Sequence, residues 1–87
     1  MTPIPDMPRL NRRFRMQWEE AQQAHVLLYP EGMVRLNRSA REILKCCDGA
    51  TTVDDIVARL ERQFNTSGLR GDVVGLLEHA LEKGWIQ

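Results

Sequence analysis

The chain has 87 residues, of which 43% are hydrophobic and 28% charged, and its 12 basic residues balance 12 acidic ones. This length and composition fit one small soluble domain. The neutral balance disfavours a dedicated nucleic-acid binder, which usually has a basic excess. No apolar run approaches the roughly 20 residues that span a bilayer, and the first residues lack the apolar core of a signal peptide. We therefore expect a cytoplasmic protein without a membrane partner.

The first 12 residues are expected to form a flexible arm. They contain Pro3, Pro5 and Pro8, and proline disfavours a helix because it lacks a backbone N–H and fixes φ. Terminal segments of this kind are commonly poorly ordered. We expect residues 13–87 to form the folded domain.

Three short strands are predicted after the arm. Residues 14–18 alternate between apolar and polar side chains, which is the period of a half-buried strand. Residues 25–29 (HVLLY) and 33–36 (MVRL) are two further β-prone runs. The Pro-Glu-Gly sequence at 30–32 is typical of a turn. We expect an antiparallel meander whose last two strands form a hairpin.

The second half of the chain has the period of helices. Apolar residues recur three and four positions apart within residues 40–47, 53–64 and 71–83. The order of elements is therefore three strands followed by three helices. This order predicts an α+β, winged-helix-like fold in which a three-stranded antiparallel sheet is followed by three helices.

The expected helix ends have typical capping residues. Either Asn37 or Ser39 can cap the first helix, and Ser39 with Glu42 fits a capping box. Thr52 with Asp55 fits a second capping box at the start of the next helix. The glycines that follow the first and third helices suit the left-handed conformation at helix C-termini.

Cys46 and Cys47 raise the question of a redox or metal site. Their Cα atoms lie about 3.8 Å apart across a trans peptide, which is below the usual span of a disulfide. Zinc sites favour a wider cysteine spacing and further ligands, and the other soft ligands are His25 and His79 on separate elements. We expect Cys47 to pack as an apolar residue with Cys46 beside it.

No catalytic, metal-binding or cofactor-binding residues are predicted. Neither histidine has a nucleophile or a carboxylate at a sequence spacing that would indicate a catalytic set. We therefore expect a binding protein and not an enzyme. A thiol-based redox or metal protein remains an alternative.

A DNA-binding transcription regulator of the winged-helix class is the main alternative. The arginines at positions 9, 12, 13 and 15 can contact phosphates, or they can form the solvent side of a strand and a soluble arm. The third helix, GDVVGLLEHALEKG, has one lysine against three acidic residues and no Asn, Gln or Arg. Such a helix is poorly suited to reading bases, so nucleic acid is not the expected partner.

The third predicted strand offers another mode of binding. An extended peptide can add to the edge that residues 33–36 would form, with a helix lining the groove. Alternatively, this edge is simply short and is blunted by Arg35. The residues alone leave both readings open.

The sequence as a whole resembles the PqqD family of pyrroloquinoline quinone (PQQ) biosynthesis. The resemblance runs through LLYPEGMVRLNRSAREILKCCDGATTVDDIVARL and RGDVVGLLEHALEKGWI, and back to about Arg13. Its specific pieces are Leu28-Tyr29-Pro30-Glu31-Gly32, Leu36-Asn37, Ala40, Ile43-Leu44, Cys47-Asp48-Gly49, Thr52-Val53 and Asp72-Val73. One departure is Cys46, where the family more often has an aliphatic residue.

The resemblance implies a peptide chaperone without a cofactor of its own. Proteins of this family bind the ribosomal precursor peptide PqqA and present it to the radical SAM enzyme PqqE. In their fold the precursor pairs with the third strand and lies against the third helix. By position, this implies peptide-binding roles for Met33, Val34, Arg35, Leu36, Asp72, Val73, Leu76, Leu77 and Ala80. The oligomeric state stays open between a monomer and a homodimer that exchanges strands through the arm.

Overall fold

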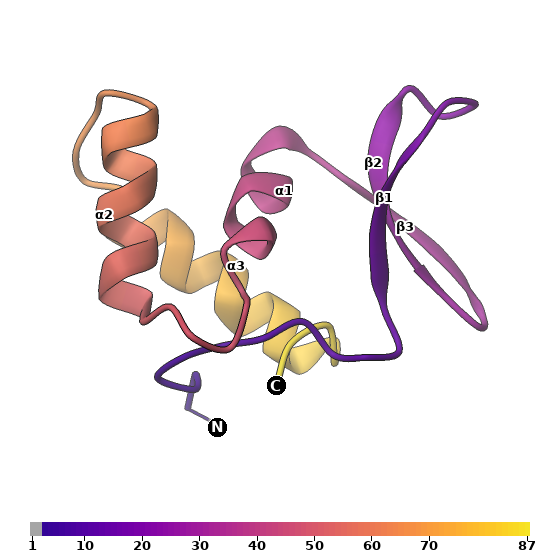
Figure 1. Ribbon diagram of the computed structural model, residues 1–87, viewed down its shortest axis with the longest axis horizontal. Helices are drawn as coiled ribbons and strands as arrows, with labels where there is room; N and C mark the ends of the chain where they lie inside the picture. Colours follow the sequence, from indigo (N-terminus) through magenta and orange to yellow (C-terminus); the bar gives the residue numbers. More distant parts are fainter. Residues whose placement is uncertain (1–2) are drawn as a thin grey trace.

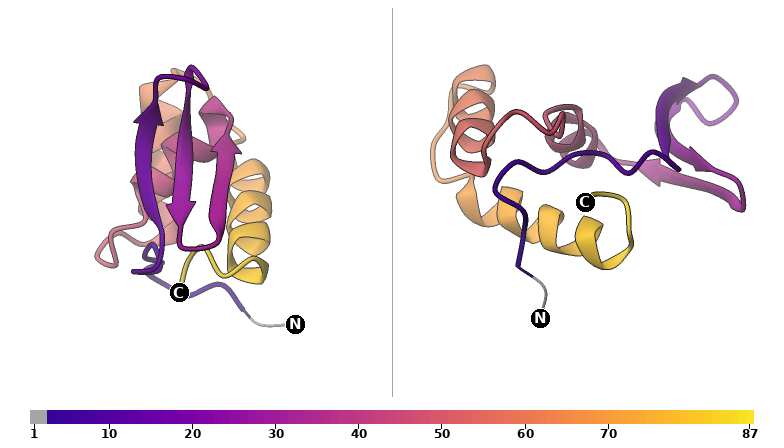
Figure 2. Two further views of the ribbon diagram at one scale, coloured as in Figure 1. Left: turned by 90° about the vertical axis from the view of Figure 1, so that its right-hand side faces the viewer. Right: turned by 60° about the horizontal axis from the view of Figure 1, so that its bottom comes forward.

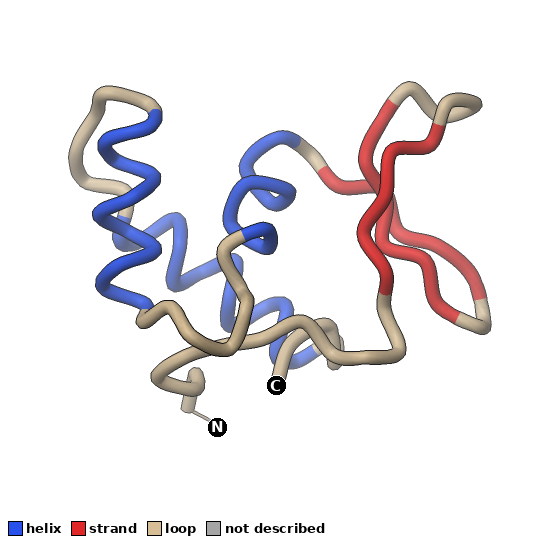
Figure 3. Tube along the Cα trace, in the orientation of Figure 1, coloured by secondary structure: helices blue, strands red, loops and turns tan. Residues whose placement is uncertain are grey.

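The computed structural model describes residues 3–87, and residues 1–2 of the expected arm lie outside the described residues. Three strands precede three helices, as the sequence predicts (Figures 1 and 3). The elements are β1 (Arg15–Glu19), β2 (Ala24–Tyr29), β3 (Gly32–Leu36), α1 (Arg38–Lys45), α2 (Val53–Gln63) and α3 (Arg70–Glu82). The α+β fold class is confirmed. Within the described part of the chain, no helix is long and apolar enough to cross a membrane.

The sheet has β2 at its centre, with β1 and β3 antiparallel on either side. Leu27 of β2 pairs with Met16 and Val34, and these three side chains belong to or pack against the hydrophobic core. The preceding residue of β2, Val26, pairs with Gln17 and so lies on the opposite face. The sheet therefore packs one face against the helices, which lie behind it in Figure 2 (left).

The core is built from the apolar stripes of all three helices. Their spacing of three and four residues places one side of each helix inward. The buried members are Ala40, Ile43 and Leu44 of α1, Ile56, Val57 and Leu60 of α2, and Val73, Leu77 and Ala80 of α3. Burial of one such large apolar side chain stabilises the fold by about 1.5–3 kcal/mol.

The two candidate caps of α1 are distinguished by the structure. Asn37 is the N-cap, and its side chain accepts a backbone N–H of the first turn at 2.8 Å. Ser39 lies inside the helix, so the expected capping box of Ser39 with Glu42 is not formed. The expected cap of α2 is present, because Thr52 accepts a hydrogen bond from the N–H of Asp55 at 3.1 Å.

The N-terminal segment makes backbone hydrogen bonds to distant parts of the chain over residues 6–11. Arg9 exchanges two backbone hydrogen bonds with Gln87, at 3.1 and 2.9 Å. Leu10 donates to the carbonyl oxygen of Cys47 at 3.1 Å. Proline favours extended backbone, which is also the conformation that such β-type bonds require. The segment therefore joins the α1–α2 turn to the end of the chain.

Gly49 packs directly against this segment, and its replacement by alanine is expected to destabilise the fold. Its φ is +77°, and an added Cβ would lie 3.3 Å from the Cβ of Arg9. Gly68 is a matched control, because its φ is +78° and a Cβ there would meet nothing within 4 Å. Both variants incur the left-handed backbone cost of about 1–2 kcal/mol. We expect urea unfolding to show a further loss of about 1 kcal/mol for Gly49→Ala alone. Equal losses would mean that the contact with Arg9 contributes nothing.

Candidate functional site

The outer edge of β3 offers unpaired backbone groups. β3 is an edge strand, and no other strand of residues 3–87 lies on its outer side. The two residues that flank a two-residue hairpin turn form a hydrogen-bonded pair, and the pairing alternates along the ladder. From this register, Val34 and Leu36 direct their N–H and C=O groups toward β2. The backbone groups of Met33 and Arg35 therefore point outward, where an extended chain can reach them.

A surface groove separates β3 from the C-terminal half of α3, and we call it the β3–α3 groove. Figure 2 (left) shows α3 running alongside the sheet next to β3. The residues that line the groove are Phe14, Tyr29, Val34, Arg35, His79, Lys83 and Trp85. The ring of His79 meets Trp85 edge-on, with 5.2 Å between the ring centroids. The groove thus combines apolar surface with basic side chains at the open edge of the sheet.

The nine residues that the family resemblance implied fall into two groups. Leu36, Val73, Leu77 and Ala80 are buried in the core. The other five are accessible in whole or in part, and these are Met33, Val34, Arg35, Asp72 and Leu76. Val34 and Arg35 line the β3–α3 groove.

Sequence reasoning missed His79 and Lys83 on the groove side of α3. The helical period contained the signal, because positions 72, 76, 79 and 83 lie three and four residues apart and share one side of a helix. The residues that the resemblance implies on α3 include Asp72 and Leu76 of this side, together with Val73, Leu77 and Ala80, which are buried in the core. The wall of the groove, with His79 and Lys83, is therefore displaced around the helix from the core-facing residues.

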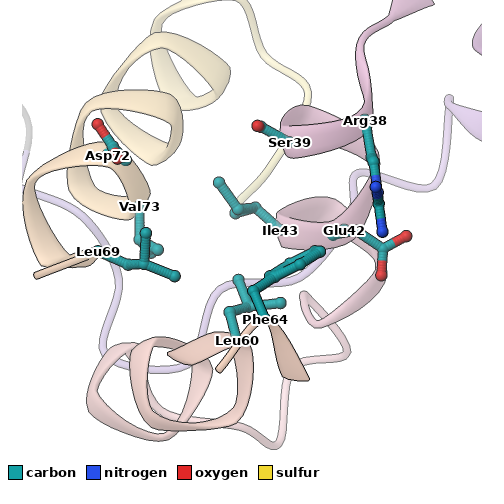
Figure 4. A pocket seen from close by; sticks show the side chains of 9 residues that line it. All are labelled: Arg38, Ser39, Glu42, Ile43, Leu60, Phe64, Leu69, Asp72 and Val73. Carbon is teal, nitrogen blue, oxygen red and sulfur yellow. The ribbon is translucent and has the colours of Figure 1, made fainter. Parts of the chain in front are cut away.

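A second hollow lies where the three helices meet, and we call it the three-helix cavity (Figure 4). Its volume is about 210 Å³. It is lined by Arg38, Ser39, Glu42 and Ile43 of α1, Leu60 and the adjoining Phe64 at the end of α2, and Leu69, Asp72 and Val73 at the start of α3. Figure 4 shows Ile43 and Ser39 extending from α1 toward α3 across this space. Apolar side chains form its floor, and the exposed Arg38, Ser39 and Asp72 lie at its rim.

Glu42 is a buried carboxylate that joins two helices beside this cavity. It accepts hydrogen bonds from Gln63 at 2.7 Å and from Arg41 at 2.8 Å. Lys45 adds a cation at 3.9 Å. The hydrogen bond from Gln63 lowers the pKa of Glu42, with Arg41 and Lys45 acting in the same direction against the opposing effect of burial. The ionised form of Glu42 is therefore the one that the fold favours.

The stability of the fold is expected to depend on pH through Glu42. A carboxyl whose pKa is lowered on folding stabilises the protein above its ordinary pKa, and this contribution is lost as pH falls through the folded value. We expect urea unfolding to show a steeper loss of stability for the wild type than for Glu42→Gln between about pH 5 and pH 3. Glu78→Gln, at an exposed position of α3, is the control and should retain the wild-type slope. The same slope in all three proteins would contradict this role of Glu42.

Cys46 and Cys47 are both free and buried. Each sulfur donates to a carbonyl oxygen one turn earlier, Cys46 to Glu42 at 3.4 Å and Cys47 to Ile43 at 3.5 Å. Burial raises the pKa of Cys47 to about 12. In the described residues, no group of three or more His, Cys, Asp or Glu side chains is arranged to hold a metal ion. Cys47 packs as a core residue, as expected.

The match to a known family covers most of the fold. The family model described as "Coenzyme PQQ synthesis protein D (PqqD)" matches residues 24–86. The chain belongs to the PqqD family. The resemblance found in the sequence is thereby confirmed.

Curated members of the PqqD family are similar to this chain over nearly their whole length. A "PqqA binding protein" of Methylococcus capsulatus is 53% identical over 78 residues, which cover 90% of this chain and 84% of the relative. The "PqqA binding protein" of Azotobacter vinelandii is 52% identical over 87 residues, which cover 99% of this chain and 95% of the relative. Both PqqD relatives are therefore named for binding PqqA.

A solved structure from the PqqD family has the same fold. It is the solution NMR structure of the PqqD truncation of Methylobacterium extorquens PqqCD, with a TM-score of 0.80 and 29% sequence identity. The match covers 100% of this chain and 95% of that one. That protein is described as a functional, stand-alone recognition element for ribosomally synthesised and post-translationally modified peptides.

Proposed function

We propose that this protein is a peptide chaperone of PQQ biosynthesis, which binds the precursor peptide PqqA and presents it to the radical SAM enzyme PqqE. It acts by binding and performs no chemistry itself. The names of the PqqD relatives and the description of the NMR structure support the choice of ligand. The observation that carries the proposal is the open outer edge of β3 beside the groove of α3.

The precursor binds as an added strand. The outward N–H and C=O groups of Met33 and Arg35 pair with its main chain. Val34 and Leu36 hold β3 in register with β2, so they support this edge from the inner side. Main-chain pairing supplies affinity in this mode, and pockets for alternate side chains supply specificity.

The predicted residues of α3 also fall into two groups, those that contact the peptide and those that hold the helix in place. Asp72 and Leu76 are accessible and contact the bound peptide. Val73, Leu77 and Ala80 are buried, so they fix the position of α3 relative to the sheet. His79 and Lys83 join the contacting set because they line the groove.

Isothermal titration calorimetry with synthetic PqqA tests the first part of the proposal. We expect saturable binding of one peptide per chain. Duplex DNA is the comparison, and a steep dependence of its binding on salt is the signature of phosphate contacts. Binding of DNA without binding of PqqA would replace the proposed function with the nucleic-acid alternative.

Presentation to PqqE is tested separately by size-exclusion chromatography. We expect this protein, PqqA and anaerobically purified PqqE to elute as one complex. A version of the chain with Arg35→Pro should fail to bring the peptide into that complex. Recovery of PqqA with PqqE alone, in the same amount, would contradict the role in presentation.

A further inference from the structure

The β3–α3 groove and the three-helix cavity lie along one side of α3. Together they indicate which side chains of a bound peptide are recognised and how far apart these lie. Resting on the proposed function, we propose that the bound peptide is read at two points about five residues apart. One apolar side chain enters the three-helix cavity. One acidic side chain lies between Arg35 and Lys83 in the β3–α3 groove.

The first point rests on the size and lining of the cavity. Ile43, Leu60 and Val73 form a buried apolar floor, and the half-buried Phe64 forms part of the wall. An apolar cavity of about 150 Å³ stays dry and binds benzene, so about 210 Å³ is enough for one aromatic or branched aliphatic side chain. The oxygens of Glu42 in the lining already accept hydrogen bonds from neighbouring side chains. An apolar occupant therefore leaves no polar group of the floor newly unsatisfied.

The second point rests on charge. Arg35 of β3 and Lys83, the C-cap residue of α3, are exposed and line the groove from opposite sides. Among the side chains of residues 3–87, neither has an acidic partner within the 4.0 Å of an ion pair. The acidic residues of the same half of α3, Glu78 and Glu82, are absent from the lining of the groove. A carboxylate is thus the side chain that complements this end.

The spacing follows from the geometry of α3 and of an extended chain. Asp72 lines the cavity and Lys83 lines the groove. Eleven residues of helix separate them, which corresponds to about 16 Å. An extended peptide covers that distance in about five residues. The same peptide passes from β3 onto the start of α1, because Arg38 and Ser39 line the cavity directly after β3 ends.

An alanine scan of synthetic PqqA, followed by calorimetry, tests the rule. We expect two positions four to six residues apart, one acidic and one apolar, at which alanine lowers affinity by about tenfold. Ser39→Trp fills the cavity from its rim, so alanine at the apolar position of PqqA should no longer lower the affinity. Lys83→Ala should abolish much of the penalty at the acidic position. Arg59→Trp, an exposed site on α2 that does not line the cavity, is the control and should change neither.

The outcomes separate this inference from the proposed function. Wild-type protein that binds PqqA without such a pair of positions overturns the two-point rule and leaves strand addition standing. A wild-type protein that does not bind PqqA overturns both. Thermal unfolding of Ser39→Trp checks its fold, and Asp72→Phe, which fills the cavity from the side of α3, gives the same test independently. If neither variant reduces the loss of affinity that alanine causes at the apolar position of PqqA, the cavity does not bind that side chain.

Discussion

Arg35→Pro is expected to lower the affinity for PqqA by about 10- to 100-fold while the protein remains folded. Proline removes the backbone N–H of residue 35 and places its ring where an added strand would lie. The N–H of Arg35 points outward in the register of β3, so the ladder to β2 loses no hydrogen bond. Edge strands tolerate proline for this reason.

Arg35→Ala is the matched control for this effect. It removes the same side chain but keeps the backbone donor, so it should lose only the share of affinity that the Arg35 side chain supplies and should bind PqqA more tightly than Arg35→Pro. Calorimetry measures both proteins, and circular dichroism checks that both are folded. Equal affinities of Arg35→Pro and the wild type would show that the outer edge of β3 does not receive the peptide. Equal losses in both variants would assign the effect to the side chain.

The thiol of Cys47 is expected to react at least about 30-fold more slowly in the native protein than in the unfolded chain, because the loss of thiolate outweighs the higher nucleophilicity of the thiolate that remains. Its pKa is raised from 9.0 to about 12, and the thiolate is the reactive form. Burial also limits access of the reagent, since Cys47 is only 6% exposed. Reaction with a chromogenic disulfide reagent, with and without denaturing urea, measures the two rates.

Cys46→Ala isolates the thiol of Cys47, and Cys47→Ala gives the companion measurement for Cys46. We expect slow reaction in both native variants, because both sulfurs are buried in the core. A native rate close to the unfolded rate would contradict the core role of these residues. It would also support the alternative that the protein has a thiol-based redox function.

Local patterns in the sequence predicted the elements of the fold because each depends on near neighbours. The alternation within residues 14–18 and the Pro-Glu-Gly turn place β1 and the hairpin correctly. The cap of α1 was ambiguous, because Asn37 and Ser39 are both good caps two positions apart. Only the helix start at Arg38 distinguishes them.

Features that depend on distant parts of the chain could not be predicted in the same way. The N-terminal segment forms backbone hydrogen bonds with Cys47 and Gln87. No local sequence pattern predicts partners so far along the chain. The three-helix cavity likewise needs three elements to meet. For α3, hydrophobic periodicity identified the stripe that faces the core. The groove is lined instead by residues such as His79 and Lys83 beside that stripe, whose role depends on the placement of β3.

An NMR titration of isotope-labelled protein with synthetic PqqA tests the central claim most directly. The predicted result is a saturable shift of the amides of residues 33–36, together with those of Asp72, Leu76, His79 and Lys83. The strongest effects should fall on Met33 and Arg35, whose N–H groups face the added strand. The absence of any shift, or a salt-sensitive shift confined to residues 9–15, would contradict peptide binding at the edge of β3.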